Sequence, residues 1–161
     1  MASRPQPATP ANDPAMTLLE LLWRLDHGLQ RVSKRMLGVL GVTGPQRVVI
    51  RTIGRFSGLT PGDLARRVHD HPSTLTGVLK RLERDGLVVR AGDPADQRRF
   101  HLYLTQAGLK IDAVREGTAE SAVRAALARL PEAEVTAFQR VLVAIAEELE
   151  RTAEAGLRKA E

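Results

Sequence analysis

The stretch LTPGDLARRVHDHPSTLTGVLKRLERDG, residues 59–86, decides the fold. Its first part, Thr60-Pro61-Gly62-Asp63, is typical of a helix start, because threonine caps free N–H groups, proline fits the first turn, and the third-position carboxylate accepts from the backbone. We expect this helix to end near Val68. Pro72 then begins a second helix, which Asp85-Gly86 ends. Two short helices joined by a tight turn form a helix-turn-helix unit.

The sequence that follows changes from a helical period to a period of two. Leu87–Arg90 and Phe100–Leu104 are predicted strands, because apolar and polar residues alternate along the second of them. Between them lies Ala91–Arg99, AGDPADQRR, which is rich in turn-forming residues. We name this loop the wing. We expect a β-hairpin that presents Arg98 and Arg99 to the outside.

Further helices are predicted on both sides of this region. Gly44-Pro45 begins one that ends at Ser57-Gly58. Thr105 caps another of about 25 residues, which stops before Pro131. The fold class is therefore mainly α with a small β-wing: a winged helix-turn-helix plus a helical dimerisation region.

Two long terminal helices carry apolar stripes. In the first, from Thr17 to about Leu40, apolar residues recur every three or four positions, and Val135 to Leu149 follow the same spacing after Pro131. A single stripe often packs against the chain's own core. A domain as small as the middle segment cannot cover both, so we expect a second copy to do so in a C2 homodimer.

The predicted organisation has four parts. Residues 1–15, with four prolines and few apolar side chains, are predicted to be a disordered tail. Residues 16–43 form an N-terminal dimerisation helix, and residues 44–104 form the winged helix-turn-helix DNA-binding domain. Residues 105–161 form a linker helix and a C-terminal dimerisation helix.

Composition excludes several classes of protein. The formal net charge is +5 at pH 7, and the whole excess falls in residues 44–104, which hold eleven Lys/Arg and six Asp/Glu. A basic segment suits a polyanionic partner. The absence of cysteine excludes disulfides and thiolate zinc sites. No apolar run approaches about 20 residues and no signal pattern is found, so we expect a cytoplasmic protein with no membrane partner and no cofactor.

The second helix of the helix-turn-helix unit suits the major groove of DNA. That groove admits one α-helix, whose N-terminal residues meet the base edges while flanking groups hold phosphates. Hydroxyl residues near the helix start can bond to bases or phosphate, and basic residues follow. The candidate DNA-contacting residues of this helix are Ser73, Thr74, Thr76, Gly77, Lys80, Arg81 and Arg84. A face rich in Lys and Arg is also typical of ordinary solvated surface.

The wing favours the DNA interpretation. Arg98 and Arg99 suit the narrow minor groove, where negative potential is concentrated. Asp96, two residues before Arg98, is expected to brace that arginine through a hydrogen-bonded ion pair, which lowers the rotamer entropy lost on binding. These three residues complete the candidate DNA site.

Five motifs follow one another along the chain: LTPGDLA (59–65), PSTLT (72–76), LERDGLV (82–88), DPADQRR (93–99) and LTQAG (104–108). In this order they resemble the MarR family of bacterial transcriptional regulators, with a likeness from about Thr17 to Leu149. The wing pattern Asp-x-Arg followed by Leu-Thr-x-x-Gly is the most specific part. The resemblance implies a homodimer, two winged domains on a palindromic DNA site and, often, a small-molecule pocket between the DNA-binding and dimerisation regions.

Two positions depart from that family pattern. His71 stands where relatives usually have a Ser or Thr helix cap, and Gly77 stands where many have a larger, often basic, base-reading side chain. An Arg contact to guanine is worth about 1–3 kcal/mol of discrimination. Without it, readout depends more on the wing and on DNA shape, or binding is weak.

An effector site is a further hypothesis, which the resemblance and four residues on helices that should adjoin motivate. These residues are Trp23, His27, Arg47 and Arg51. The alternative is that Trp23 anchors a dimer core and the arginines contact phosphate, because large aromatic side chains usually serve packing.

The sequence therefore predicts a sequence-specific DNA-binding transcriptional regulator and not an enzyme. We expect a repressor that binds a palindromic operator as a homodimer and responds to a small-molecule effector. One alternative is a winged-helix protein-interaction module with weak or lost DNA binding, which the missing base-reading side chain at Gly77 suggests. Another is a metal-dependent enzyme. Against it, two metal ligands on one helix are normally four residues apart, and no acidic general base lies at the spacing that known metalloenzyme motifs require. Its candidate ligands are His27, His69, His71 and His101 with Asp26 or Asp70.

Overall fold

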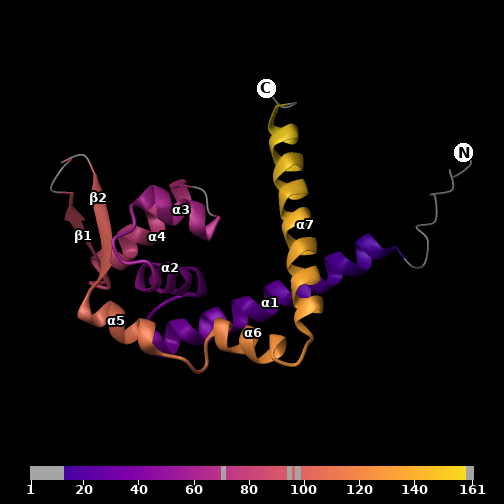
Figure 1. The fold of residues 1–161 in the computed structure, drawn as a ribbon, viewed down its shortest axis with the longest axis horizontal. Helices are drawn as coiled ribbons and strands as arrows, with labels where there is room; N and C mark the ends of the chain where they lie inside the picture. Colours follow the sequence, from indigo (N-terminus) through magenta and orange to yellow (C-terminus); the bar gives the residue numbers. More distant parts are fainter. Residues whose placement is uncertain (1–12, 70–71, 94–95, 97–98, 159–161) are drawn as a thin grey trace, which may run out of the picture. The chain divides into compact units, whose positions relative to one another are not determined.

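A computed structural model describes residues 13–69, 72–93, 96 and 99–158. The chain divides into two compact units, residues 1–119 and 120–161. The elements, labelled in Figure 1, are α1 (Pro14–Leu40), α2 (Gly44–Arg55), α3 (Pro61–Val68), α4 (Pro72–Arg84), β1 (Val88–Gly92), β2 (Phe100–Leu104), α5 (Gln106–Ala113), α6 (Ala119–Leu127) and α7 (Glu132–Arg158). The predicted fold class is confirmed, because helices dominate and the two strands form one small sheet.

Helix α1 begins earlier than the sequence analysis predicted. Asp13 is its N-cap, and the Asp13 carboxylate accepts a hydrogen bond from the backbone N–H of Ala15 at 2.9 Å. The tail predicted for residues 1–15 is therefore wrong for residues 13–15, and residues 1–12 lie outside the described part. The helix ends at Gly41, whose φ of +72° lies in the left-handed region that glycine adopts without strain.

Capping boxes begin α2 and α3, as the local sequence predicts for α3. The Thr43 hydroxyl accepts from the backbone N–H of Gln46, whose side chain accepts from the N–H of Thr43. Thr60 and Asp63 make the same pair of bonds at α3. The hydrogen bond from the Thr60 hydroxyl lowers the pKa of Asp63, although partial burial opposes the shift. The predicted starts of α2 and α3 are confirmed, and the turn predicted at residues 70–71 lies outside the described residues.

The hydrophobic core of the first unit lies among α2, α3, α4 and the sheet. Full burial of an aliphatic side chain contributes about 1.5–3 kcal/mol. The core residues are Val42, Val49, Ile50, Ile53, Leu64, Ala65, Leu75, Leu79, Leu82, Val88 and Leu102. Three of them, Leu75, Leu79 and Leu82, are spaced at i, i+4 and i+7, so they line one face of α4 and leave the opposite face outside the core.

Strands β1 and β2 form an antiparallel hairpin whose register pairs Val88 with Leu104 at one end and Gly92 with Phe100 at the other. The turn between α2 and α3 pairs with the middle of β2. The N–H of Leu102 donates to the carbonyl of Leu59 at 2.8 Å, and the N–H of Gly58 donates to the carbonyl of Leu102 at 3.1 Å. The hairpin that carries the wing is thus joined to the helix-turn-helix unit.

The single long helix predicted from Thr105 to Pro131 is wrong. Thr105 does cap α5, through an N–H···O bond from Gly108 at 3.1 Å, but α5 ends at Ala113. Residues 114–118 separate it from α6, with Gly117 in the left-handed region at φ +68°. The prediction of one long helix overlooked residues 115–118, REGT, which hold no apolar residue and include a glycine.

Two arginines of α2 account for the break. Arg47 is only 1% exposed, and its guanidinium donates to the carbonyl of Ile111 and, at 2.5 Å, to that of Val114. Arg51 donates to the carbonyl of Asp112 at 3.1 Å and to its carboxylate at 2.7 Å. Carbonyl groups at the end of α5 therefore accept from arginine side chains instead of from another helical turn. We name Arg47 and Arg51 the arginine pair.

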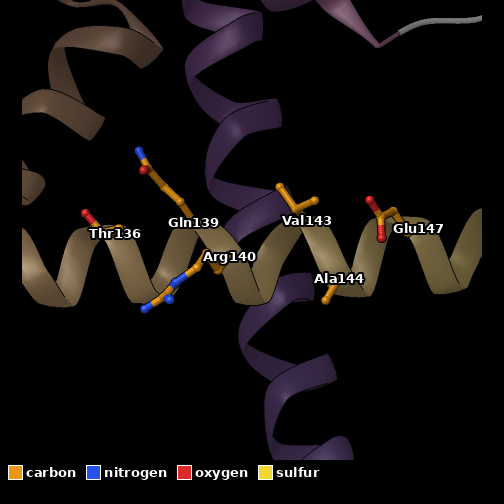
Figure 2. Close-up of a pocket in the computed structure, with 6 residues that line it drawn as sticks. All are labelled: Thr136, Gln139, Arg140, Val143, Ala144 and Glu147. Atoms are coloured by element: carbon orange, nitrogen blue, oxygen red, sulfur yellow. The ribbon is translucent and has the colours of Figure 1, made fainter.

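In the second unit, α7 begins directly after Pro131 and has Glu132 and Glu134 in its first turn, as predicted. A shallow cavity of about 380 Å³ runs along this helix (Figure 2). Its lining residues are Thr136, Gln139, Arg140, Val143, Ala144 and Glu147. Because all six belong to α7, the cavity is an open groove on one helix. Within the described ranges, no helix combines the length and apolarity that a bilayer crossing requires.

Candidate nucleic-acid interface

Helix α4 has one buried face and one exposed face. The leucines at positions 75, 79 and 82 are each at most 2% exposed. The exposed residues of the helix include every α4 position predicted to contact DNA: Ser73, Thr74, Thr76, Gly77, Lys80, Arg81 and Arg84. The structure therefore brings these seven positions together on one helix, and none of them belongs to the core.

The exposed residues of α4 are ordered by chemistry along the helix. Hydroxyl groups occupy the N-terminal part, where backbone N–H groups carry partial positive charge, and Lys80, Arg81 and Arg84 follow. Arg84 pairs with Asp85 at 3.1 Å with its side chain 73% exposed. An exposed pair of this kind is worth about 1 kcal/mol or less, so the guanidinium can exchange it for a phosphate.

Gly77 lies in the middle of α4 among these exposed residues. A Cβ built at this position meets no atom within 4 Å, so packing does not require glycine there. The missing side chain removes one candidate base contact and lets the α4 backbone approach a groove more closely.

The wing is closed by backbone hydrogen bonds. The N–H of Asp93 donates to the carbonyl of Arg99 at 3.0 Å, and the N–H of Arg99 donates to the carbonyl of Asp96 at 2.9 Å. Asp96 and Arg99 are both exposed. The predicted ion pair between Asp96 and Arg98 stays a prediction, because Arg98 lies outside the described residues.

Arg90, which the sequence analysis missed, joins the hairpin to α4. Its guanidinium pairs with Glu83 at 2.5 Å and lies over the ring of Phe100, 4.8 Å from the ring centroid. A cation over an aromatic face contributes about 0.5–1 kcal/mol at an exposed site. The periodicity of apolar residues does not predict these contacts of Arg90, because Glu83 lies on α4 and Phe100 lies on the neighbouring strand β2.

His101, which the sequence analysis named only as a candidate metal ligand, makes two contacts within the winged helix-turn-helix region. Its Nδ1 lies 2.7 Å from the carbonyl oxygen of Gly58, and its Nε2 lies 3.1 Å from a carboxylate oxygen of Asp93. The alternation along β2 predicted only that His101 lies on the face opposite Leu102. Its partners join the start of the wing to the turn between α2 and α3.

The predicted effector residues occupy different environments. Trp23 is 71% exposed on α1, and its carbonyl lies 2.8 Å from Nδ1 of His27. Arg47 is buried and donates to the carbonyls of Ile111 and Val114, which does not fit a contact to an effector or to phosphate. Arg51 is half-buried and paired with Asp112. A role in effector binding stays a prediction for Trp23, His27 and Arg51.

The candidate metal ligands are dispersed among separate elements. His27 lies on α1, His69 ends α3, and His101 lies on β2. Across the described ranges, no three His, Cys, Asp or Glu side chains gather as a metal site requires. His71 and Asp70 lie outside those ranges.

Comparison with known proteins is consistent with this interface. The sequence profile of the MarR family matches residues 42–100. The HTH-type transcriptional repressor Rv2887 of Mycobacterium tuberculosis is 30% identical over 122 residues, which cover 76% of this chain and 88% of the relative. The HTH-type transcriptional regulator FarR of Neisseria gonorrhoeae is 40% identical over 85 residues, 53% of this chain and 58% of the relative.

Solved structures resemble the fold over most of its length. The PcaV transcriptional regulator of Streptomyces coelicolor, crystallised with its natural ligand, has a TM-score of 0.67 at 27% identity and covers 86% of this chain and 98% of its own. The MepR–DNA complex of S. aureus has a TM-score of 0.67 at 23% identity and covers 81% of this chain and 96% of its own. At that identity the second likeness concerns the fold alone.

Proposed function

Because the chain belongs to the MarR family of transcriptional regulators, we propose that it represses transcription by binding a palindromic DNA operator as a homodimer. The observation that carries this proposal is the division of α4 into a buried leucine face and an exposed polar and basic side. We place the protein in the cytoplasm and assign it no enzymatic activity. The repressor role is supported by the Mycobacterium relative, which is named as a transcriptional repressor.

The chemistry of α4 supports major-groove binding. Ser73 and Thr74, in the first turn, can bond to base edges or phosphate, as can the backbone N–H groups beside them. Lys80, Arg81 and Arg84 lie further along the helix, where cations neutralise phosphates at the groove edge. Arg98 and Arg99 of the wing extend the contact to the adjacent minor groove. In this arrangement α4 sets the register and the wing adds shape readout.

The homodimer is supported by apolar side chains that one copy leaves exposed. Helix α1 exposes Trp23 at 71%, and α7 exposes Phe138 and Leu149 at 47% and 58%. Covering such surface by C2 pairing buries it in both copies at once. We expect sedimentation to give twice the 17.6 kDa of one chain at micromolar concentration, and a monomer would contradict the dimer.

DNA binding itself is tested by its dependence on salt. Genomic fragments bound by the protein are footprinted, and the protected site is then titrated at 50 and 200 mM salt. A dimer that neutralises about six phosphates should lose roughly 10³-fold in affinity over that range, because bound counterions are released. The footprint should show two half-sites about 34 Å apart. Failure of a folded dimer to bind any duplex at low salt would favour the protein-interaction module.

The contribution of the wing to DNA affinity is measured with two arginine variants in the same salt titration, one in the wing and one outside the DNA-binding region. Arg98→Ala should weaken binding at least about tenfold and make the salt dependence shallower by about one contact per copy. Arg129→Ala, an exposed arginine outside the DNA-binding region, should leave both unchanged. Equal behaviour of the two variants would remove the wing from the proposed interface.

Ligand control is a further part of the proposal. PcaV, whose structure matches 86% of this chain, has been solved with a natural ligand. Trp23, His27 and Arg51 are the residues of this chain that we assign to such a site. Any ligand found by thermal shift must also alter DNA affinity, because linkage makes the coupling reciprocal.

A further inference from the structure

His101 contacts two parts of the DNA-binding region, the start of the wing and the turn between α2 and α3. Its Nε2 lies 3.1 Å from the carboxylate of Asp93, the residue whose backbone N–H closes the wing onto Arg99. Its Nδ1 lies 2.7 Å from the carbonyl of Gly58, 43 residues earlier in the chain. The backbone of Gly58 is also held to β2, because its N–H donates to the carbonyl of Leu102 at 3.1 Å. The imidazole therefore bridges the start of the wing and the turn between α2 and α3.

The two oxygen partners decide which form of the imidazole fits. A carbonyl and a carboxylate can only accept hydrogen bonds, so each needs an N–H from the ring. Neutral imidazole has one N–H and can satisfy either Gly58 or Asp93, whereas the protonated ring has two and satisfies both. The bond between the protonated ring and the carboxylate is also charge-assisted, and such bonds are about twice as strong as neutral ones.

The charged surroundings of His101 favour its protonated form. The hydrogen bond that His101 donates to Asp93, and then the one that it donates to Gly58, raise the pKa of His101 above its ordinary value of 6.5, while partial burial and the charge of Arg99 oppose the shift. The strand partner of His101 is Ala91, which carries no charge. On the neighbouring helices, the guanidinium groups of Arg55 and Arg67 lie over the ring of Phe56.

The sign of the pH dependence follows from this direction. A group whose pKa is raised in the folded state adds stability that is fully present below its unfolded pKa. The added stability is lost as the pH rises through the folded pKa. The bridge is therefore complete in mildly acidic solution and loses one of its two hydrogen bonds above that pKa.

We propose that His101 is a positioning residue for the wing: its protonated ring holds the wing to the turn between α2 and α3, so that DNA affinity falls as the pH rises. This inference rests on the proposed DNA-binding function. It assigns His101 no contact with DNA. Asp93 and the Gly58 carbonyl are the partners through which it acts.

The test is a titration of the footprinted duplex at constant salt from pH 6.0 to 8.5. For the wild-type protein we expect the dissociation constant to rise roughly threefold to tenfold across this range, the difference between a charge-assisted and a neutral hydrogen bond. His101→Gln, which cannot titrate, should bind weakly with no such rise. Asp93→Asn, which removes the carboxylate, should move the midpoint of the rise to lower pH.

A matched histidine separates this effect from the general influence of positive charge on DNA binding. His69→Asn removes an exposed histidine at the end of α3, where a φ of +50° suits asparagine, and should keep the wild-type pH profile. An equal pH dependence in wild type and His101→Gln overturns the inference, as does a flat wild-type profile. Failure of the wild type to bind any duplex at low salt overturns the proposed function instead.

A second measurement does not require a folded variant or bound DNA. The imidazole resonances of His101 in the free wild-type protein are followed by NMR as the pH is changed. The bridge predicts a midpoint above the ordinary histidine value of 6.5, because the carboxylate of Asp93 and the carbonyl of Gly58 both accept from the protonated ring. A midpoint for His101 at or below 6.5 overturns the inference.

Discussion

Gly108→Ala is expected to lower the free energy of unfolding by about 3 kcal/mol or more, the upper end of the usual cost of overpacking. A Cβ at this position would lie 2.1 Å from the backbone oxygen of Leu87, a separation that real atoms do not tolerate. The oxygen cannot retreat freely, because it accepts the N–H of Thr105 at 3.1 Å. The hydroxyl of Thr105 in turn donates to Gly86 and caps α5 through the N–H of Gly108. Relief of the clash must therefore disturb the start of α5, the adjoining strand, or both.

Urea unfolding followed by circular dichroism measures the change in the free energy of unfolding of Gly108→Ala. In thermal unfolding, the melting temperature is expected to fall by roughly 10 °C. Gly77→Ala is the matched control, because it also adds one methyl group to a helix. Its Cβ meets no atom within 4 Å, so the better helix propensity of alanine should stabilise the protein by about 0.5–1 kcal/mol. A loss below about 1 kcal/mol for Gly108→Ala would mean that the start of α5 moves more easily than its capping bonds indicate.

Gly108 also illustrates what local sequence can predict. Thr105 was predicted to begin a helix because a cap acts on an N–H three residues away, and this bond forms. The starts of α3 and α4 follow from equally short spacings. The exposed side of α4 could be predicted as well, because a period of 3.6 residues separates Leu75, Leu79 and Leu82 from the candidate DNA-contacting residues.

Features formed by distant residues could not be predicted in this way. The end of α5 depends on Arg47, which lies 64 residues before its acceptor Ile111. The local sequence carried one sign of the break, Gly117 within residues 115–118 (REGT), but it did not show the contacts of Arg47. The bridge from His101 to Gly58 spans 43 residues and likewise leaves no local pattern. In the candidate site, the exposed side of α4 was thus predictable, whereas the contacts of His101 with Gly58 and Asp93 were not.

Arg47→Ala is the second substitution with a large expected effect, a loss of about 3 kcal/mol in the free energy of unfolding. The substitution removes a long buried side chain and leaves a cavity between α2 and α5. It also removes two hydrogen bonds from a charged donor to the carbonyls of Ile111 and Val114. Each carbonyl keeps another hydrogen-bond donor, which limits the loss of stability. The carbonyl of Ile111 still accepts from the backbone N–H of Val114, and the carbonyl of Val114 still accepts from the guanidinium of Arg115.

The loss of packing and the loss of hydrogen bonds are separated by Arg47→Met, which fills most of the space with an apolar chain. Because both carbonyls still lose the hydrogen bond from the Arg47 guanidinium, we expect this variant to remain about 1–2 kcal/mol less stable than the wild type in urea unfolding. Arg51→Ala, in the same arginine pair, removes a side chain that is 33% exposed and should cost about 1 kcal/mol or less. Hydrogen exchange at residues 111–118 should rise in both Arg47 variants, since those backbone groups lie at the break that Arg47 stabilises. If Arg47→Met proved as stable as the wild type, with unchanged exchange there, the guanidinium would not be the cause of the break, and the end of α5 would have to be explained by the left-handed turn at Gly117 alone.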